Sequence, residues 1–203
     1  AVSGHELTAR RSIEGELLHT LDDTSRKAKK DMLVIADAQK AAGLAGIMGG
    51  FETEITPKTT TVILEAAKFY GPNIRRTSRF CNLISEASGR FERGTDIENT
   101  IRALNRAAQL LQEMGACTVC KDVLDVYPNK KEPAVVNFTA DEINEHLGTS
   151  IPKATMLDIL QKLEINTADK GAYITADIPS WRNDISCMQD ISEEISRIYG
   201  FDK

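Results

Sequence analysis

The sequence predicts an α+β protein in two parts, a mixed α/β domain over residues 1–132 and a smaller α+β domain over residues 133–203. Alternating and β-branched runs are interspersed with segments of helical periodicity along the whole chain. A polar stretch with a proline at each end, residues 128–133, separates the two parts. The charge changes there as well: residues 1–132 contain 19 Lys and Arg against 18 Asp and Glu, whereas the remainder contains 6 against 12.

The composition is that of an ordinary globular protein, because 41% of the 203 residues are hydrophobic and 27% are charged. It excludes disordered and collagen-like chains. No apolar run approaches the roughly 18 residues of a membrane span, so no membrane is expected as a partner. Four cysteines and no secretory signal predict a reducing, cytoplasmic location. The chain begins without methionine, at Ala1, which suggests a piece of a longer protein.

The first part is predicted to contain strands near residues 32–36, 44–48, 59–65 and 117–126, where β-branched or alternating residues are frequent. The basic run at residues 26–30 is predicted to be a hairpin tip. Gly71 and Pro72 open a helix over residues 72–80. Thr95 and Glu98 form a predicted capping box for a core-facing helix that ends at Gly115, with apolar residues at 97, 101, 104, 108, 111 and 114.

The second part has the predicted order β-α-α-β-β-α. A short strand covers residues 135–138. Thr139 and Glu142 form a capping box for a helix that ends at Gly148. A second helix covers residues 152–163. A turn at 169–171 joins two strands, and a last helix covers about 187–199.

A glycine-rich segment, residues 43–50, has four glycines in eight residues between strand patterns. Glycine allows close backbone approach to a ligand, so the segment is a candidate pocket wall, but a tight strand connection is the more frequent use of such spacing. Glu65 is the lone acid in the apolar run 62–67, at the end of a strand predicted to be buried. Its carboxylate is either paired with a nearby arginine or accepts a hydrogen bond from a polar ligand.

Five arginines lie between residues 75 and 93, against two glutamates. Guanidinium groups bind phosphate well, and a solvated helix surface explains the cluster equally well. Their positions are Arg75, Arg76, Arg79, Arg90 and Arg93.

Four carboxylates lie within eleven residues at the start of the last predicted helix: Asp184, Asp190, Glu193 and Glu194. Oxygen ligands alone suit a hard cation such as Mg²⁺ or Ca²⁺. The alternative is that acids are favoured in a first helical turn and that Glu193 pairs with Arg197 on the surface.

Taken together, these segments resemble the beta chain of bacterial phenylalanine-tRNA ligase. The resemblance extends over nearly the whole chain and is carried, in order, by residues 44–50, 63–67, 85–96, 178–184 and 198–202. It implies that residues 1–132 form most of an editing domain, N-terminally incomplete, and that residues 133–203 form a small winged-helix-like domain.

The resemblance further implies hydrolytic editing of mischarged tyrosyl-tRNA(Phe). Glu65 matches the family's phenol-recognising glutamate, Ala45 and Gly46 match its pocket wall, and Ser85 and Ala87 match residues that hold water and shape the pocket. Ser85 replaces the usual threonine and keeps the hydroxyl, while Glu86 and Gly89 also depart from the family pattern. A segment with a histidine normally precedes Ala1, so editing by this chain alone is expected to be weak.

For the acidic stretch, the resemblance implies Mg²⁺ bound by Asp184, Asp190, Glu193 and Glu194 and shared with the alpha chain of an alpha2-beta2 tetramer. ATP-dependent charging of tRNA(Phe) with phenylalanine would then occur at the alpha-chain site. The alternative is a non-catalytic RNA-binding or subunit-docking module that has lost editing. The acidic charge of the second part argues against its binding nucleic acid by itself.

Overall fold

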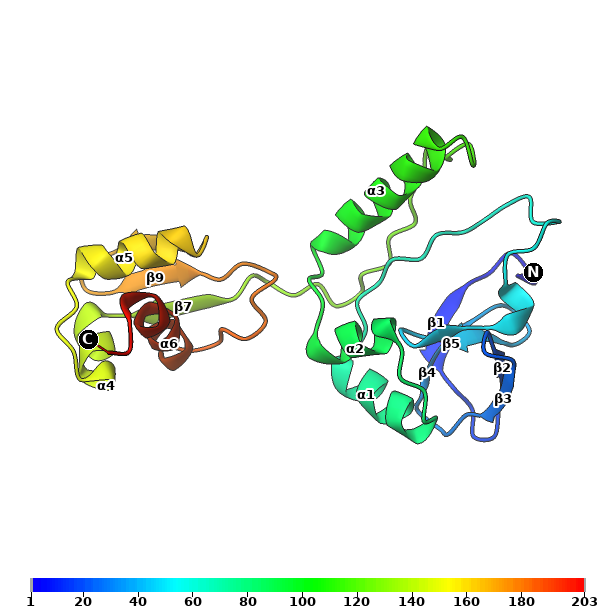
Figure 1. Cartoon of the computed structure of the whole chain (residues 1–203), viewed down its shortest axis with the longest axis horizontal. Coiled ribbons are helices and arrows are strands. Elements are labelled where there is room, and N and C mark those ends of the chain that lie inside the picture. The colour runs from blue at the N-terminus through cyan, green and yellow to red at the C-terminus, as the bar shows by residue number, and fades with distance from the viewer. Residues whose placement is uncertain (1, 203) are drawn as a thin grey trace. The chain divides into compact units, whose positions relative to one another are not determined.

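The computed structural model describes residues 2–202 and divides them into two compact units between Ala116 and Cys117 (Figure 1). Each unit has its own hydrophobic core. The mixed α+β class predicted from the sequence is confirmed in both units. Within residues 2–202, no helix combines the length and the apolar character needed to cross a bilayer.

Six short strands form the β-structure of the first unit. They are β1 (Thr8–Arg11), β2 (Leu17–Thr20), β3 (Thr24–Lys27), β4 (Leu33–Ala36), β5 (Ala41–Leu44) and β6 (Met48–Gly49). Antiparallel pairing gives one sheet in the order β1-β4-β5-β6 and a separate β2-β3 hairpin. Val34, Leu44 and Ile47 are among the buried residues that anchor the sheet in the core.

The helices of the first unit follow a short 3-10 turn, η1 (Phe51–Thr53). They are α1 (Gly71–Phe80), α2 (Glu86–Arg93) and α3 (Asn99–Glu113). α1 and α2 pack side by side next to the β-structure (Figure 1). α2 begins at a capping box that the sequence analysis missed: the Ser85 hydroxyl accepts a hydrogen bond from the Ser88 amide, and the Ser88 hydroxyl accepts one from the Ser85 amide.

The strands predicted at 59–65 and 117–126 are wrong, because both segments are irregular and pair with no described strand. β-branched residues favour an extended backbone, but a strand also needs a neighbour to complete its hydrogen bonds. The apolar residues before Glu65 are exposed rather than buried, with Ile63 at 63%. The basic run does not form the hairpin tip, since β3 contains Arg26 and Lys27 while the turn lies at residues 21–23.

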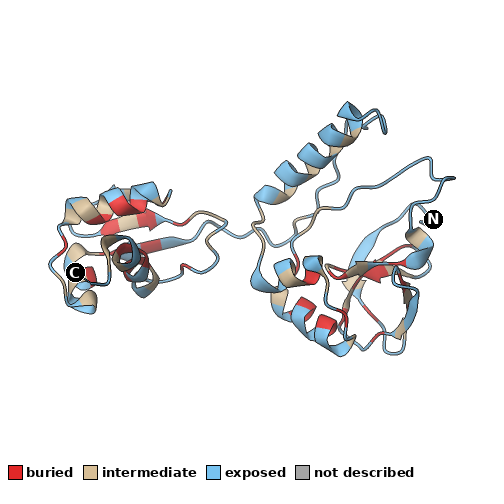
Figure 2. Cartoon of the chain, viewed as in Figure 1, coloured by how far each residue is buried: buried red, intermediate tan, exposed pale blue. Residues whose placement is uncertain are grey.

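α3 is helical as predicted, but it is not core-facing. None of its residues is buried, and Figure 2 shows the helix in exposed and intermediate colours only. Its predicted capping box is absent; Glu98 is the N-cap residue without a side-chain cap. Amphipathic spacing determines which side of a helix can be buried, whereas burial also requires a partner surface.

The second unit follows the predicted order. It contains β7 (Val135–Phe138), α4 (Ala140–Leu147), α5 (Lys153–Lys162), β8 (Asn166–Asp169), β9 (Ile174–Asp177) and α6 (Met188–Tyr199). The three strands are antiparallel in the order β7-β9-β8. The capping box at Thr139 and Glu142 and the left-handed Gly148 that ends α4 are confirmed. Phe138, Ile143, Leu160, Ile191 and Ile195 are almost fully buried in its core.

The first part of the second unit, residues 117–134, contains no helix or strand. The predicted domain boundary at 132/133 lies inside this stretch.

Candidate functional site

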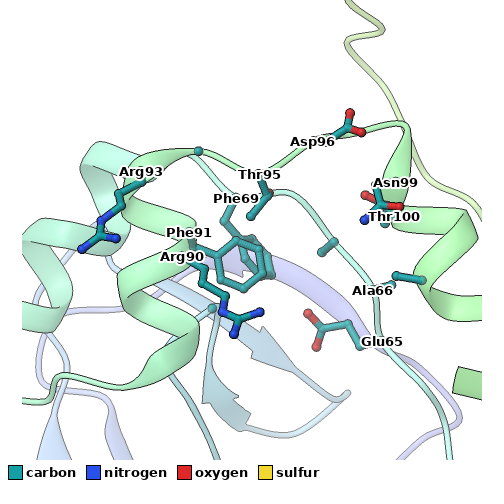
Figure 3. A pocket seen from close by; sticks show the side chains of 14 residues that line it. Glu65, Ala66, Phe69, Arg90, Phe91, Arg93, Thr95, Asp96, Asn99 and Thr100 are labelled. Atoms are coloured by element: carbon teal, nitrogen blue, oxygen red, sulfur yellow. The ribbon is translucent and has the colours of Figure 1, made fainter. Parts of the chain in front are cut away.

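A cavity of about 710 Å³ lies entirely within the first unit. Four parts of the chain line it: Gly46 between β5 and β6, the segment at 65–69, the last turns of α2 with the following loop, and the start of α3 (Figure 3). Such a concave site with apolar walls and a few polar groups is typical of a ligand pocket.

The irregular segment before α1 places Glu65 at the cavity. Glu65 keeps more than a third of its surface exposed, and partial desolvation by the surrounding protein raises the pKa of its carboxyl above the ordinary value of 4.5. Within the described residues, Glu65 has neither an ion pair nor a hydrogen bond, although Arg90 and Arg93 also line the cavity. The first alternative from the sequence, a salt bridge to a nearby arginine, is therefore wrong. The carboxylate is available to a ligand.

Two phenylalanines form an aromatic wall of the cavity. The rings of Phe69 and Phe91 have centroids 5.0 Å apart and planes tilted by 59°. Gly46 lies directly against them in the left-handed region, with φ of +67°, and a Cβ on it would be 2.8 Å from Phe69 and 3.0 Å from Phe91. Only glycine therefore allows the backbone to approach the aromatic pair so closely.

Thr95 adds a polar group to the same wall. Its hydroxyl oxygen is buried and is one of two such side-chain atoms without a hydrogen-bond partner in the described part of the chain. An unsatisfied buried hydroxyl costs about 1–3 kcal/mol, which a bound ligand or water would offset. Thr95, together with Asn99 and Thr100 at the start of α3, can therefore hydrogen-bond a polar ligand in the cavity.

The acidic stretch of the second unit is organised around one arginine. Arg182 donates hydrogen bonds from Nε and Nη2 to Asp184, at 3.0 and 2.6 Å, and from Nη1 to Glu194 at 3.0 Å. Arg197 donates to Glu194 as well, at 2.6 Å. Hydrogen bonds from Arg182 lower the pKa values of both Asp184 and Glu194. The expected surface pair of Arg197 with Glu193 is thus wrong, because Arg197 pairs with Glu194.

Asp190 is the third residue of α6 and completes the capping box at its start. Its Oδ2 accepts hydrogen bonds from the backbone amides of Ser186 and Cys187, at 2.7 and 3.0 Å, and these lower its pKa. Within residues 2–202, no three His, Cys, Asp or Glu side chains are grouped so that they could hold a metal ion. In this structure Asp184 and Glu194 are paired with arginine and Asp190 accepts hydrogen bonds at the start of α6, so binding of Mg²⁺ by these acids together with an alpha chain stays a prediction.

Two family models match the chain, and they divide it near the boundary between the two compact units. The family model of the B3/4 domain matches residues 1–116, and that of the tRNA synthetase B5 domain matches residues 136–201. The chain belongs to the B3/4 domain family. The pocket at Glu65 thus lies within the B3/4 domain, and the acidic stretch lies within the B5 domain.

Curated relatives match both domains together. The phenylalanine–tRNA ligase beta subunit of Moorella thermoacetica is 39% identical over 202 residues, and that of Syntrophus aciditrophicus is 42% identical over 200. The matches cover 100% and 97% of this chain but 25% of each relative. The beta subunit of Geobacillus kaustophilus is 39% identical over 98% of the chain. The chain therefore spans about a quarter of the length of the curated relatives it matches.

The B3/4 pocket brings together two of the five predicted editing residues, Glu65 and Gly46. Ala45 is buried in the core beside Gly46. Ser85 and Ala87 do not line the pocket, and the Ser85 hydroxyl donates to the Ile47 carbonyl at 2.7 Å.

Four of the pocket residues, Phe69, Phe91, Thr95 and Asn99, were not predicted from the sequence. Phe91 and Thr95 lie in the segment 85–96 that carries the resemblance, but only the glycine-rich segment indicated a pocket wall. Of the predicted arginine cluster, Arg90 and Arg93 line the pocket, whereas Arg75, Arg76 and Arg79 lie on α1.

Proposed function

We propose that this chain is part of a phenylalanine–tRNA ligase beta subunit and that its B3/4 pocket hydrolyses mischarged tyrosyl-tRNA. The observation that carries the proposal is the unpaired Glu65 carboxylate at a cavity with an aromatic wall. The names of the relatives supply the reaction context: a ligase for phenylalanine must reject tyrosine, which differs by one hydroxyl.

The chemistry of the pocket suits that discrimination. The Phe69 and Phe91 rings offer an aromatic surface to the side chain of a bound amino acid. A tyrosine phenol can donate a hydrogen bond to the Glu65 carboxylate, whereas phenylalanine has no group that can donate one. A site built to hydrogen-bond a hydroxyl rejects the analogue that lacks it far more strongly than an apolar pocket rejects an added hydroxyl. The Thr95 hydroxyl is placed to position the polar end of the ligand or a water molecule.

The parent enzyme would charge tRNA(Phe) at a site on the alpha chain, with ATP and phenylalanine as substrates. In that assembly the B5 domain would contact the alpha chain, and Arg182 holds its acidic stretch in place.

Replacing Glu65 by glutamine tests the proposal. A hydrogen bond to a charged group contributes about 1.5–3 kcal/mol and one between neutral groups about 0.5–1.5 kcal/mol, so the neutral amide should bind the phenol about 1–1.5 kcal/mol less tightly. In a complete ligase whose beta subunit carries this sequence, we expect the ratio of tyrosyl-tRNA to phenylalanyl-tRNA hydrolysis rates to fall about 5- to 10-fold. The control is Glu86→Gln, which removes an exposed carboxylate outside the pocket and should leave the ratio unchanged. An unchanged ratio in Glu65→Gln would contradict recognition by this carboxylate.

The same carboxylate predicts a pH dependence. Only ionised Glu65 is a full acceptor, and its raised pKa means that protonation begins at a higher pH than for an ordinary glutamate. The preference for the tyrosyl ester should therefore decrease as the pH falls from 7 toward the raised pKa, and Glu65→Gln should show no such decrease. Measuring the ratio of the two rates cancels the general effect of hydroxide on ester stability. A flat wild-type profile down to the ordinary glutamate value of 4.5 would contradict the raised pKa.

A subunit-docking module without editing activity is the second candidate. The observation in its favour is the exposed apolar side of α3, where Ile101 is 44% and Leu110 39% exposed. If a complete ligase with this sequence leaves tyrosyl-tRNA intact while charging normally, the docking function is the better explanation.

A further inference from the structure

The exposed side of α1 carries three arginines and no acid. Residues 66–85 contain Lys68, Arg75, Arg76 and Arg79 but neither aspartate nor glutamate. The opposite side of the helix is buried through Asn73, Ile74, Thr77 and Ser78, so the three arginines project into solvent. We call Arg75, Arg76 and Arg79 the arginine face.

The loop between β3 and β4 extends the positive charge beside this helix. The Lys29 ammonium lies 4.2 Å from the centre of the Phe80 ring, at the last residue of α1. At the other end, the Asn73 amide and the Arg11 guanidinium both donate to the Asp31 carbonyl at 2.8 Å, which holds the loop against the helix. Figure 1 shows the loop and α1 in the same part of the first unit. The only carboxylate in residues 26–31 is that of Asp31.

The arginine face has no ion pairs among the described residues, unlike most other arginines of the chain. Arg10, Arg26 and Arg182 each pair with a carboxylate at hydrogen-bond distance, whereas no such partner lies near Arg75, Arg76 or Arg79. Like charges three and four residues apart on a helix destabilise it by a few tenths of a kcal/mol per pair. An external anion would remove this repulsion.

Exposed aromatic rings flank the arginine face. Tyr70, 66% exposed, precedes the first residue of α1, and Phe80, 48% exposed, is its last. Tyr70 also directly follows Phe69 of the pocket wall, so the surface is continuous with the pocket along the chain. Guanidinium groups bind phosphates in a bidentate manner and aromatic rings stack on bases, and this combination is typical of surfaces that bind single-stranded nucleic acid.

We propose that the arginine face, with Lys29 and Tyr70, binds the phosphate backbone of RNA. The identity of the anion rests on the proposed function, in which an aminoacylated RNA end reaches the pocket next to Tyr70. The aromatic rings favour RNA over an acidic protein, because a carboxylate-rich partner offers no bases for stacking. The net charge of −5 does not prevent this binding, since charges beyond about 10 Å are largely screened at 0.1 M salt.

Binding of a fluorescein-labelled RNA hairpin with a four-nucleotide single-stranded 3′ end, followed by anisotropy, tests the proposal on the 203-residue chain. Changing Arg75, Arg76 and Arg79 together to glutamine should weaken binding at least about 10-fold at about 0.1 M salt. The slope of log K against log salt should become shallower by about 2, because each single-strand phosphate contact contributes about 0.7. Tyr70→Ala should weaken binding without changing the slope, since stacking releases no counterions.

The matched control removes the same charge elsewhere: Lys121, Lys130 and Lys131 changed together to glutamine, all outside the B3/4 match. If this control weakens binding as much as the arginine triple variant, RNA binding depends on the total charge of the chain and not on the arginine face. The proposal is then overturned. If the chain binds polyglutamate as tightly as it binds the RNA hairpin, the assignment of RNA as the partner is overturned. Glu65→Gln should bind the hairpin normally, so loss of editing in that variant with retained RNA binding separates the two proposals.

Discussion

Replacement of Arg182 by glutamine should lower the free energy of unfolding of the second unit by about 2–3 kcal/mol. The Arg182 side chain is 18% exposed and that of Glu194 is 11% exposed, so the substitution leaves a largely buried carboxylate with one remaining cation. Breaking a buried pair from one side costs about 3–5 kcal/mol, and partial exposure, above all of Asp184, reduces that value. Because Trp181 is the only tryptophan and lies in this unit, its fluorescence during urea unfolding measures the change there.

Arg197→Gln is the control for this prediction. Arg197 donates to the same Glu194 oxygen that Arg182 contacts, but its side chain is 48% exposed. An exposed ion pair contributes only about 0.2–1 kcal/mol. Equal losses for the two variants would contradict the central role of Arg182. A strong dependence of wild-type stability on millimolar Mg²⁺ would support the predicted binding of a cation by the four acids.

Gly46→Ala should destabilise the first unit by about 3 kcal/mol and abolish discrimination in the pocket. The added methyl group would be 2.8 Å from Phe69, 3.0 Å from Phe91 and 3.3 Å from Ile74. Overpacking of this kind costs about 1–3 kcal/mol, and the left-handed backbone adds about 1–2 kcal/mol for any residue other than glycine. Urea unfolding followed by circular dichroism measures the loss, while Trp181 fluorescence should show the second unit unchanged.

Gly15→Ala separates the two contributions. Gly15 has a similar φ of +79°, and a Cβ there would meet no atom within 4 Å. This variant should lose only the backbone contribution, about 1–2 kcal/mol, and keep its preference for the tyrosyl ester. If both glycine variants are equally destabilised, contact with the aromatic pair does not matter for stability.

The accuracy of the sequence predictions differs between the two units for a physical reason. In the second unit, capping residues, glycine stops and apolar periodicity lie close together in the chain, so local patterns locate every element. In the first unit, the strands depend on partners far along the sequence. The β1-β4 pair joins Arg11 with Leu33, and nothing in the four residues of β1, two of them arginines, indicates this pairing.

In the candidate site, too, some residues are recognisable from local sequence and others only from the tertiary structure. Glu65 is recognisable as an isolated acid in an apolar run, and Gly46 as part of a glycine-rich segment. Phe69, Phe91 and Thr95 come from three segments that only tertiary packing brings to one cavity. The acidic residues at 184–194 were recognisable as a cluster, but the sequence did not show that Arg182 pairs with two of them, Asp184 and Glu194.

Local chain chemistry was enough to establish the α+β class, the helices of the second unit, the family resemblance and the acid at position 65. The packed structure decided which apolar segments are buried, which carboxylates are paired and which side chains share the pocket. The reason is that helix caps and turns depend on residues a few positions apart, whereas burial and charge pairing depend on groups that meet only when distant segments fold against each other.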